Sequence, residues 1–160
     1  MAEKKFRLDS FAEGDTTYIE IAGPLDETSV FGDIRSDGTV KIDLLGVTRI
    51  NSVGTRNWCL WLQRFRAPTQ IVLINCPVVM VRNFSAISGF LTKLCRVSSF
   101  SVPFYSDATG ERKDFLAEWG KHFGASGDIK LPQFKDSAGN LMDLDVGDSY
   151  FNFLRPRKGN

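Results

Sequence analysis

Ser52 is the residue of this chain whose position is best suited to a chemical modification. It follows a strand-like run at 42–50 and precedes an amphipathic stretch that begins near residue 53. The pattern predicts a strand that ends in a small polar turn, with Ser52 as the N-cap of the next helix. Because a helix N-terminus stabilises negative charge, a phosphate on this hydroxyl would be accommodated locally while it changed the surface offered to a partner. The segment therefore indicates a switchable binding surface more than a catalytic pocket.

Other residues that commonly do chemistry lack the partners that catalysis needs. Asp26 and Asp43 are a candidate carboxylate pair, but no nucleophile, base or oxyanion donor accompanies them in a known motif. His122 is the only histidine, and we expect a structural role for it. The chain has no phosphate-binding glycine loop, dinucleotide fingerprint, hydrolase elbow or metal box. The sequence therefore predicts a protein that is not an enzyme and uses neither metal nor cofactor.

Composition and charge narrow the partners and the compartment. The chain has 160 residues, of which 42% are hydrophobic and 24% charged, a normal balance for a soluble globular protein. Its formal net charge of +1 gives none of the basic excess of nucleic-acid binding proteins. No run could cross a bilayer, and the N-terminus has no apolar signal core. The three cysteines, Cys59, Cys76 and Cys95, lack paired spacing, so we expect reduced thiols and a cytoplasmic protein. We also expect that it binds neither nucleic acid nor membrane.

Hydrophobic periodicity predicts an α/β domain over residues 6–104 that positions these groups. Period-two alternation and short apolar runs predict five strands, and three- and four-residue spacing predicts two helices. A run that is apolar on both sides, as at 71–74, is typical of a central strand in a covered mixed sheet. The predicted strands are 6–11, 16–22, 39–45, 71–74 and 97–104, and the predicted helices are 53–66 and 78–88.

Residues 105–160 change in character, and we expect a small β-rich appended element. Residues 112–121 fit either a short helix or a short strand, and short strands are expected at 130–134 and 140–144. An element of this size is not expected to be stable unless it docks on the first domain. An apolar patch precedes its basic end and contains Tyr150, Phe151 and Phe153.

Three motifs follow one another along the chain. The first is Gly-Pro-Leu-Asp at 23–26. The second is Ile-Asp-Leu at 42–44 with Ile-Asn-Ser-Val-Gly at 50–54, and the third is Ile-Val-Leu-Ile at 71–74 with Ile-Ser-Gly-Phe at 87–90. In this order they resemble the STAS domain family, which includes bacterial anti-sigma factor antagonists, stressosome subunits and the cytosolic ends of sulfate transporters. The resemblance implies a small mixed sheet with helices packed on one face.

The resemblance also implies a function for individual residues. In the family, a partner kinase phosphorylates a serine or threonine in an Asp-Ser-Ser/Thr-Gly turn, and phosphorylation turns off binding to that kinase. By this resemblance Ser52 is the phospho-acceptor, and Asp26 and Asp43 lie at the partner-binding edge. The chain departs from the pattern because Asn51 replaces the usual acid and Val53 the second hydroxyl. The segment between the two aspartates is also shorter than usual, so the chain resembles a divergent member.

Two turns of the appended element carry a second resemblance. They are Ser-Asp-Ala-Thr-Gly at 106–110 and Lys-Asp-Ser-Ala-Gly at 135–139, and they stand where a zinc ribbon has its two CxxCG knuckles. Both turns keep the glycine and neither has a cysteine, so no tetrahedral zinc site is expected. The resemblance implies a ribbon that has lost its metal and is held by packing.

These observations together predict a protein-interaction module of the anti-sigma factor antagonist or partner-switch type, regulated by phosphorylation at Ser52. The predicted partner is a regulatory protein such as a serine kinase or an anti-sigma factor. One alternative is a constitutive scaffold, in which Ser52 only caps the helix and the chain self-associates through the sheet edge or the aromatic patch. Another is a family relative that binds a nucleotide or other small ligand. The candidate partner-binding residues are Asp26, Asp43, Asn51, Ser52, Gly54, Thr55 and Arg56.

Overall fold

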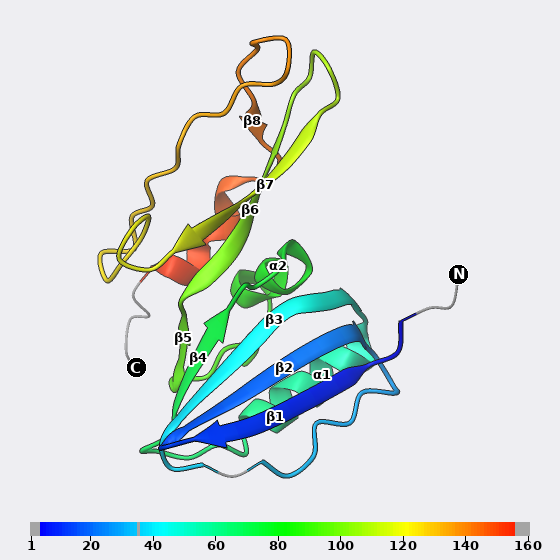
Figure 1. Cartoon of the computed structure of the whole chain (residues 1–160), viewed down its shortest axis with the longest axis vertical. Helices are drawn as coiled ribbons and strands as arrows, with labels where there is room; N and C mark the ends of the chain where they lie inside the picture. The colour runs from blue at the N-terminus through cyan, green and yellow to red at the C-terminus, as the bar shows by residue number, and fades with distance from the viewer. Residues whose placement is uncertain (1–3, 35, 156–160) are drawn as a thin grey trace.

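The computed structural model describes residues 4–34 and 36–155, and in it the chain forms two sheets (Figure 1). The first is a mixed sheet of five strands and the second a small antiparallel sheet of three. The mixed α/β class and the β-rich C-terminal element predicted from the sequence are therefore confirmed. The last five residues of the predicted appended element lie outside the described residues.

The elements of the first sheet follow the predicted order. Its strands are β1 (Arg7–Glu13), β2 (Thr16–Leu25), β3 (Thr39–Ile50), β4 (Gln70–Ile74) and β5 (Cys95–Val97). Helix α1 (Ser52–Leu62) connects β3 to β4, and α2 (Val78–Ala86) connects β4 to β5. β1 is antiparallel to β2, and β2 to β5 run parallel in the spatial order β1-β2-β3-β4-β5. Neither helix, nor any other in the described part of the chain, is long and apolar enough to cross a membrane.

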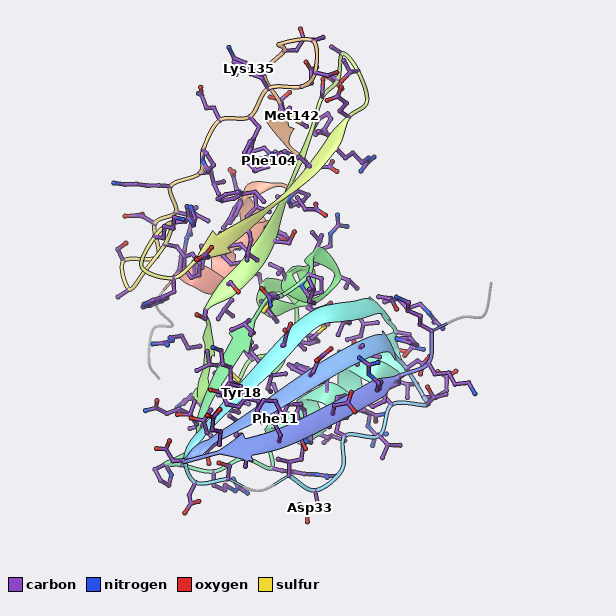
Figure 2. All side chains as sticks on the ribbon, viewed as in Figure 1. Phe11, Tyr18, Asp33, Phe104, Lys135 and Met142 are labelled. Atoms are coloured by element: carbon purple, nitrogen blue, oxygen red, sulfur yellow. The ribbon has the colours of Figure 1, made fainter. Side chains whose placement is uncertain are left out.

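Both helices pack on the same face of this sheet. Figure 1 shows α1 behind the strands, and ring contacts connect it to the end of α2. The rings of Trp58 in α1 and Phe84 in α2 each lie 5.8 Å from the ring of Phe90. The other face of the sheet is open. On it Phe11 and Tyr18 stack with their ring centroids 4.9 Å apart, toward the viewer in Figure 2.

Alternating residues of the strands explain the core. Ile19 and Ile21 of β2, and Ile42 and Leu44 of β3, point toward the helices and are buried. The predicted apolar stripe of the first helix faces them and is buried as well. The buried indole N–H of Trp58 has a hydrogen-bond partner, since its Nε1 donates to the Phe90 carbonyl oxygen at 2.9 Å. The buried stripe consists of Trp58, Trp61, Leu62 and Phe65.

The predicted strand at 97–104 is divided between the two sheets. Cys95–Val97 closes the first sheet as β5, and β6 (Ser99–Tyr105) pairs with β7 (Arg112–Glu118) and β8 (Asp143–Leu144). The backbone of Ser98 bonds to residues on both sides of this division. Its amide donates to the Leu73 carbonyl oxygen in the first sheet, and its carbonyl oxygen accepts from the Trp119 amide just after β7, both at 2.8 Å. Residues 112–118 are thus a strand, whereas 130–134 form none and only the last two residues of 140–144 do.

The aromatic patch of the appended element packs inside the molecule. It belongs to η1 (Asp148–Leu154), a 3-10 helix that lies against α2. Tyr150 is buried and its hydroxyl donates to the Ser101 carbonyl oxygen at 2.5 Å, while the Phe153 ring lies 5.4 Å from Phe84 of α2. The patch therefore docks the second sheet on the first.

Candidate functional site

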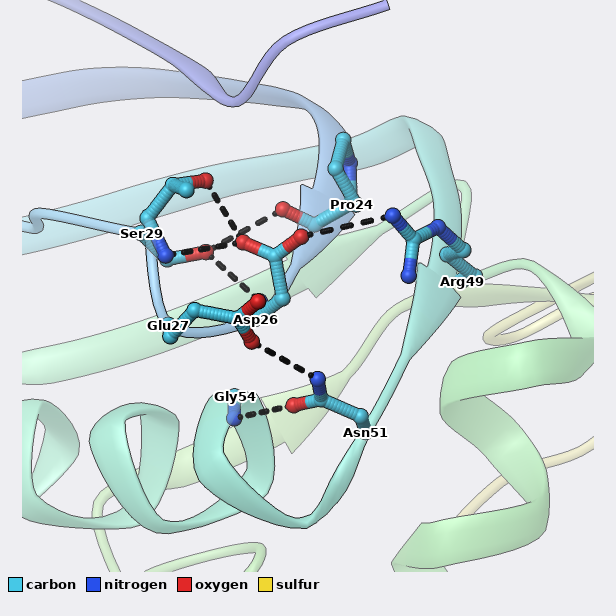
Figure 3. Close-up of polar contacts among 8 residues, drawn as sticks. Pro24, Asp26, Glu27, Ser29, Arg49, Asn51 and Gly54 are labelled. Atoms are coloured by element: carbon cyan, nitrogen blue, oxygen red, sulfur yellow. Dashed lines mark hydrogen bonds and ion pairs between the residues drawn. The ribbon is translucent and has the colours of Figure 1, made fainter. Parts of the chain in front are cut away.

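The end of β2 and the start of α1 meet at one end of the first sheet. The Asn51 amide donates to the Leu25 carbonyl oxygen at 3.1 Å. Gly54 comes so close to β2 that a Cβ built on it would lie 1.8 Å from the same oxygen. Segments 23–28 and 51–56, which contain every predicted partner-binding residue except Asp43, are thus brought together by a backbone contact that only glycine permits (Figure 3).

Asn51 is the N-cap of α1, so the prediction that Ser52 caps this helix is wrong. Asn51 has an extended backbone, and its side-chain Oδ1 accepts from the Gly54 amide at 2.9 Å. Its Nδ2 donates to Glu27 Oε2 at 3.0 Å, which ties the cap to the loop after β2. Asparagine and serine are equally strong N-caps, and here the helix begins one residue earlier than the pattern suggested.

Ser52 is consequently the first helical residue and is exposed. Its hydroxyl makes no hydrogen bond within the part of the chain that the structure describes, whereas the neighbouring Thr55 hydroxyl donates to the Asn51 carbonyl oxygen at 2.9 Å. Arg56 is also exposed and stands four residues after Ser52, on the same side of the helix. Ser52 therefore does not cap this helix.

Asp26 is buried in the loop that faces this helix. Its Oδ1 accepts from the Thr28 hydroxyl at 2.5 Å and from the Thr28 amide at 2.9 Å, and Oδ2 lies 3.5 Å from Arg49 Nη2. The Thr28 hydroxyl and amide, assisted by the positive charge of Arg49, hold the pKa of Asp26 below its usual range although burial opposes this. The carboxylate therefore stays ionised and stabilises the loop.

Asp43 does not join this cluster. It pairs with Glu20 in the register of β2 and β3, whereas the end of β2 pairs with Ile50. Ile50 is seven positions after Asp43 along the strand, about 23 Å at about 3.3 Å per residue. Its Oδ1 accepts from the Leu45 amide at 3.0 Å and from Asn75 Nδ2 at 3.2 Å, so it stabilises the turn after β4 instead.

Sequence reasoning missed two residues that shape the site and the role of a third. Arg49 pairs with Asp26, and the Ser29 hydroxyl donates to the Pro24 carbonyl oxygen at 3.1 Å. Glu27 lies in the segment 23–28, but its bond with Asn51 was not predicted. An Asp-x-Thr sequence is a known turn signal, so the turn at Asp26 could have been predicted. The role of Arg49 depends on the register of β2 with β3 and has no local signal.

The Cys76 thiol and the His122 imidazole take part in the packing and hydrogen bonding of the fold. Cys76 is fully buried, and burial, with the nearby Asp43 charge, raises the pKa of its thiol well above the usual value. His122 Nδ1 accepts from the Glu118 amide at 3.0 Å, and its ring meets Phe115 edge-on at 4.8 Å. Within residues 4–34 and 36–155, no three His, Cys, Asp or Glu side chains are grouped so that they could hold a metal ion.

No protein-family model, curated protein or solved structure matches this chain.

The capping assignment makes a simple prediction. Asn51→Ala removes the side-chain acceptor for the Gly54 amide and should lower the free energy of unfolding by about 1 kcal/mol. Ser52→Ala removes a hydroxyl without a partner and should change it by less than about 0.5 kcal/mol. Urea unfolding followed by tryptophan fluorescence measures both. An equal loss for the two variants would contradict the assignment.

Proposed function

We propose that this chain is a protein-interaction module of the partner-switch type, in which phosphorylation of Ser52 controls docking at the surface formed by 23–28 and 51–56. The observation that carries the proposal is the exposed, unbonded hydroxyl of Ser52 on the first residue of a helix that another residue caps. A kinase could modify this hydroxyl without breaking any contact that holds the fold.

The surroundings of Ser52 suit a phosphate. The N-terminus of α1 favours negative charge, and Arg56 lies one turn further along the same side of the helix. A phosphoserine adds about 1.5 to 2 negative charges and three strong acceptor oxygens. The modification would therefore change the charge of the surface greatly while leaving the core intact.

The same surface suggests the chemistry of the partner. Arg56 is exposed, and the side chain of Arg49 is 52% exposed although it pairs with the buried Asp26. Val53, between them in the chain, is 43% exposed and offers an apolar contact. These groups fit a partner whose docking surface is acidic around a small apolar centre, and a phosphate on Ser52 would repel it. The order of the motifs at 23–26 and 50–54, and their meeting in the fold, supports a divergent STAS-like module.

A capture experiment tests the proposal. Wild type, Ser52→Ala and Ser52→Asp are immobilised and exposed to lysate of the source organism, and bound proteins and phosphosites are quantified by mass spectrometry. We expect a regulatory kinase or anti-sigma factor on wild type and Ser52→Ala, at least tenfold less of it on Ser52→Asp, and phosphate on Ser52 in the endogenous protein.

The matched control is Ser88→Asp, which adds the same charge at another exposed serine and should retain the partner. Ser52→Asp itself should unfold at the wild-type temperature or slightly above it, because its charge stands at a helix N-terminus. Equal capture by all four proteins, with Ser52 never modified, would refute the proposal.

A further inference from the structure

A cleft of about 220 Å³ lies where the two sheets join, away from the site described above. The edge strand β5 and the loop before it form one side, and the turn after β7 and the end of η1 form the other. Its apolar lining includes Leu91, Phe123 and Phe153, with the indole of Trp119 at the side. Clefts at the junction of two structural units are common positions for small-molecule sites.

The charged side chains that line this cleft are both positive. Lys93 and Arg96 line it, and no aspartate or glutamate does. Both cations are exposed, and neither has an ion pair with a carboxylate of the described residues. The whole chain is nearly balanced, with 20 basic and 19 acidic residues, whereas the lining of this cleft has two cations and no carboxylate beside its apolar wall.

Arg96 is also held in position. Its guanidinium carbon lies 5.5 Å from the centroid of the Trp119 ring, a cation–π contact between the two sheets. A guanidinium that rests on an aromatic face keeps its planar fork of N–H donors oriented, and this fork matches the two oxygens of a carboxylate. Because less side-chain freedom remains to be lost, binding of an anion there costs less entropy.

We propose that this cleft binds a small planar carboxylate, with the carboxylate on Arg96 and Lys93 and the planar part against Trp119 and the apolar wall. The volume is sufficient for a single ring with an acidic group. The two cations select for the charge, and the aromatic and aliphatic lining selects for the ring.

Benzoate is the probe, and benzyl alcohol, which has the same ring without the charge, is its control. The full chain is titrated and followed by ¹⁵N-resolved NMR. Trp119 is 40% exposed, whereas the other two tryptophans, Trp58 and Trp61, are at most 2% exposed, so its indole N–H signal reports on the cleft. We expect saturable shifts of Trp119 and β5 with a Kd of about 1 mM for a ligand of this size, and at least tenfold weaker binding of benzyl alcohol.

Three variants separate a specific site from general attraction. Arg96→Gln should weaken benzoate binding at least tenfold, and Lys93→Gln about fivefold, while both keep a dispersed folded spectrum because these side chains are exposed. Lys135→Gln removes the same charge at the far tip of the second sheet (Figure 2) and should bind like wild type. The proposal is overturned if benzoate gives no saturable shift up to 20 mM, if benzyl alcohol binds equally well, or if Arg96→Gln binds like wild type.

Discussion

Gly54→Ala should destabilise the fold by about 3 kcal/mol, the upper part of the range for overpacking. In an exposed helix the same substitution usually stabilises, by roughly 0.5 to 1 kcal/mol, because alanine is the better helix former. The expected sign is reversed here since the added Cβ would lie 1.8 Å from the Leu25 carbonyl oxygen and 2.7 Å from the Asp26 amide nitrogen.

The clash cannot be relieved by a side-chain rotation, because the three atoms nearest to the new Cβ belong to the backbone of Leu25 and Asp26. Helix α1 cannot shift away easily either. Trp58 and Trp61 fix it in the core, where each is at most 2% exposed. The strain must therefore appear as lost stability, as a separation of α1 from the loop at Asp26, or as both, and the second effect would also weaken capture of the proposed partner.

Gly147→Ala is the matched control for this prediction. Gly147 has an ordinary φ of −81°, and a Cβ built there would meet no atom within 4 Å. Its substitution should change the free energy of unfolding by less than about 0.5 kcal/mol. Urea unfolding of the two variants and wild type, followed by tryptophan fluorescence, gives the comparison. A Gly54→Ala protein as stable as wild type would mean that α1 does not approach β2 as closely as described.

Local sequence patterns were sufficient for most elements of the first sheet. The apolar alternation of β2 and β3 and the stripe that contains Trp58 and Trp61 depend on residues near one another in the chain, and the structure confirms them. The length of β3 was underestimated. Residues beyond Leu45 lose the simple alternation, because the pairing with β2 shifts register between Glu20 and Ala22.

Features that depend on distant residues could not be predicted in this way. The run at 97–104 reads as one strand, but its division at Ser98 is decided by Leu73 and Trp119, which lie on either side of it in space. The choice between Asn51 and Ser52 as helix cap also depends on the third dimension. Both residue types cap well, and the hydrogen bond of Asn51 to Glu27 has no counterpart in local pattern.

The two turns that resemble zinc knuckles show the same limit. The sequence predicted correctly where the turns occur, since Gly110 and Gly139 both have the left-handed backbone that such turns need, with φ of 73° and 84°. The resemblance implied that packing would hold the two turns together in place of a metal. Instead a buried carboxylate, Asp136, connects one turn to the other, and its partners lie up to 30 residues away.

Asp136→Asn should therefore have the second large effect. Oδ2 of Asp136 accepts from the Ser106 hydroxyl at 2.6 Å and from the Thr109 hydroxyl at 3.2 Å. Oδ1 accepts from the Ala138 amide at 2.9 Å and from the Asn140 amide at 2.8 Å. An asparagine has the same shape but turns one acceptor into an N–H₂ donor, which would face the Ala138 and Asn140 backbone amides on one side or the Asn140 Nδ2 donor on the other. We expect the unfolding temperature to fall by about 8 °C.

Asp107→Asn is the control for Asp136→Asn. It makes the same change of charge on an exposed side chain in the first turn, and it should lower the unfolding temperature by less than about 2 °C. Amide hydrogen exchange adds a local measurement. Asp136→Asn should increase exchange at Ala138 and Asn140 much more than in α1, because the change is in the second sheet.

The pH dependence of the unfolding temperature tests whether the charge of Asp136 stabilises the fold. The Ser106 hydroxyl, followed by the donors of Asn140 and Ala138, holds the pKa of Asp136 far below its usual range although burial opposes this. A carboxyl group with a lowered pKa in the folded state stabilises that state fully above its unfolded pKa of about 4, and this contribution is lost as the pH falls further. The unfolding temperatures of wild type and Asp136→Asn should thus differ most at pH 7 and converge below about pH 4. A difference that stayed constant down to pH 2 would mean that the charge of Asp136 does not stabilise the fold.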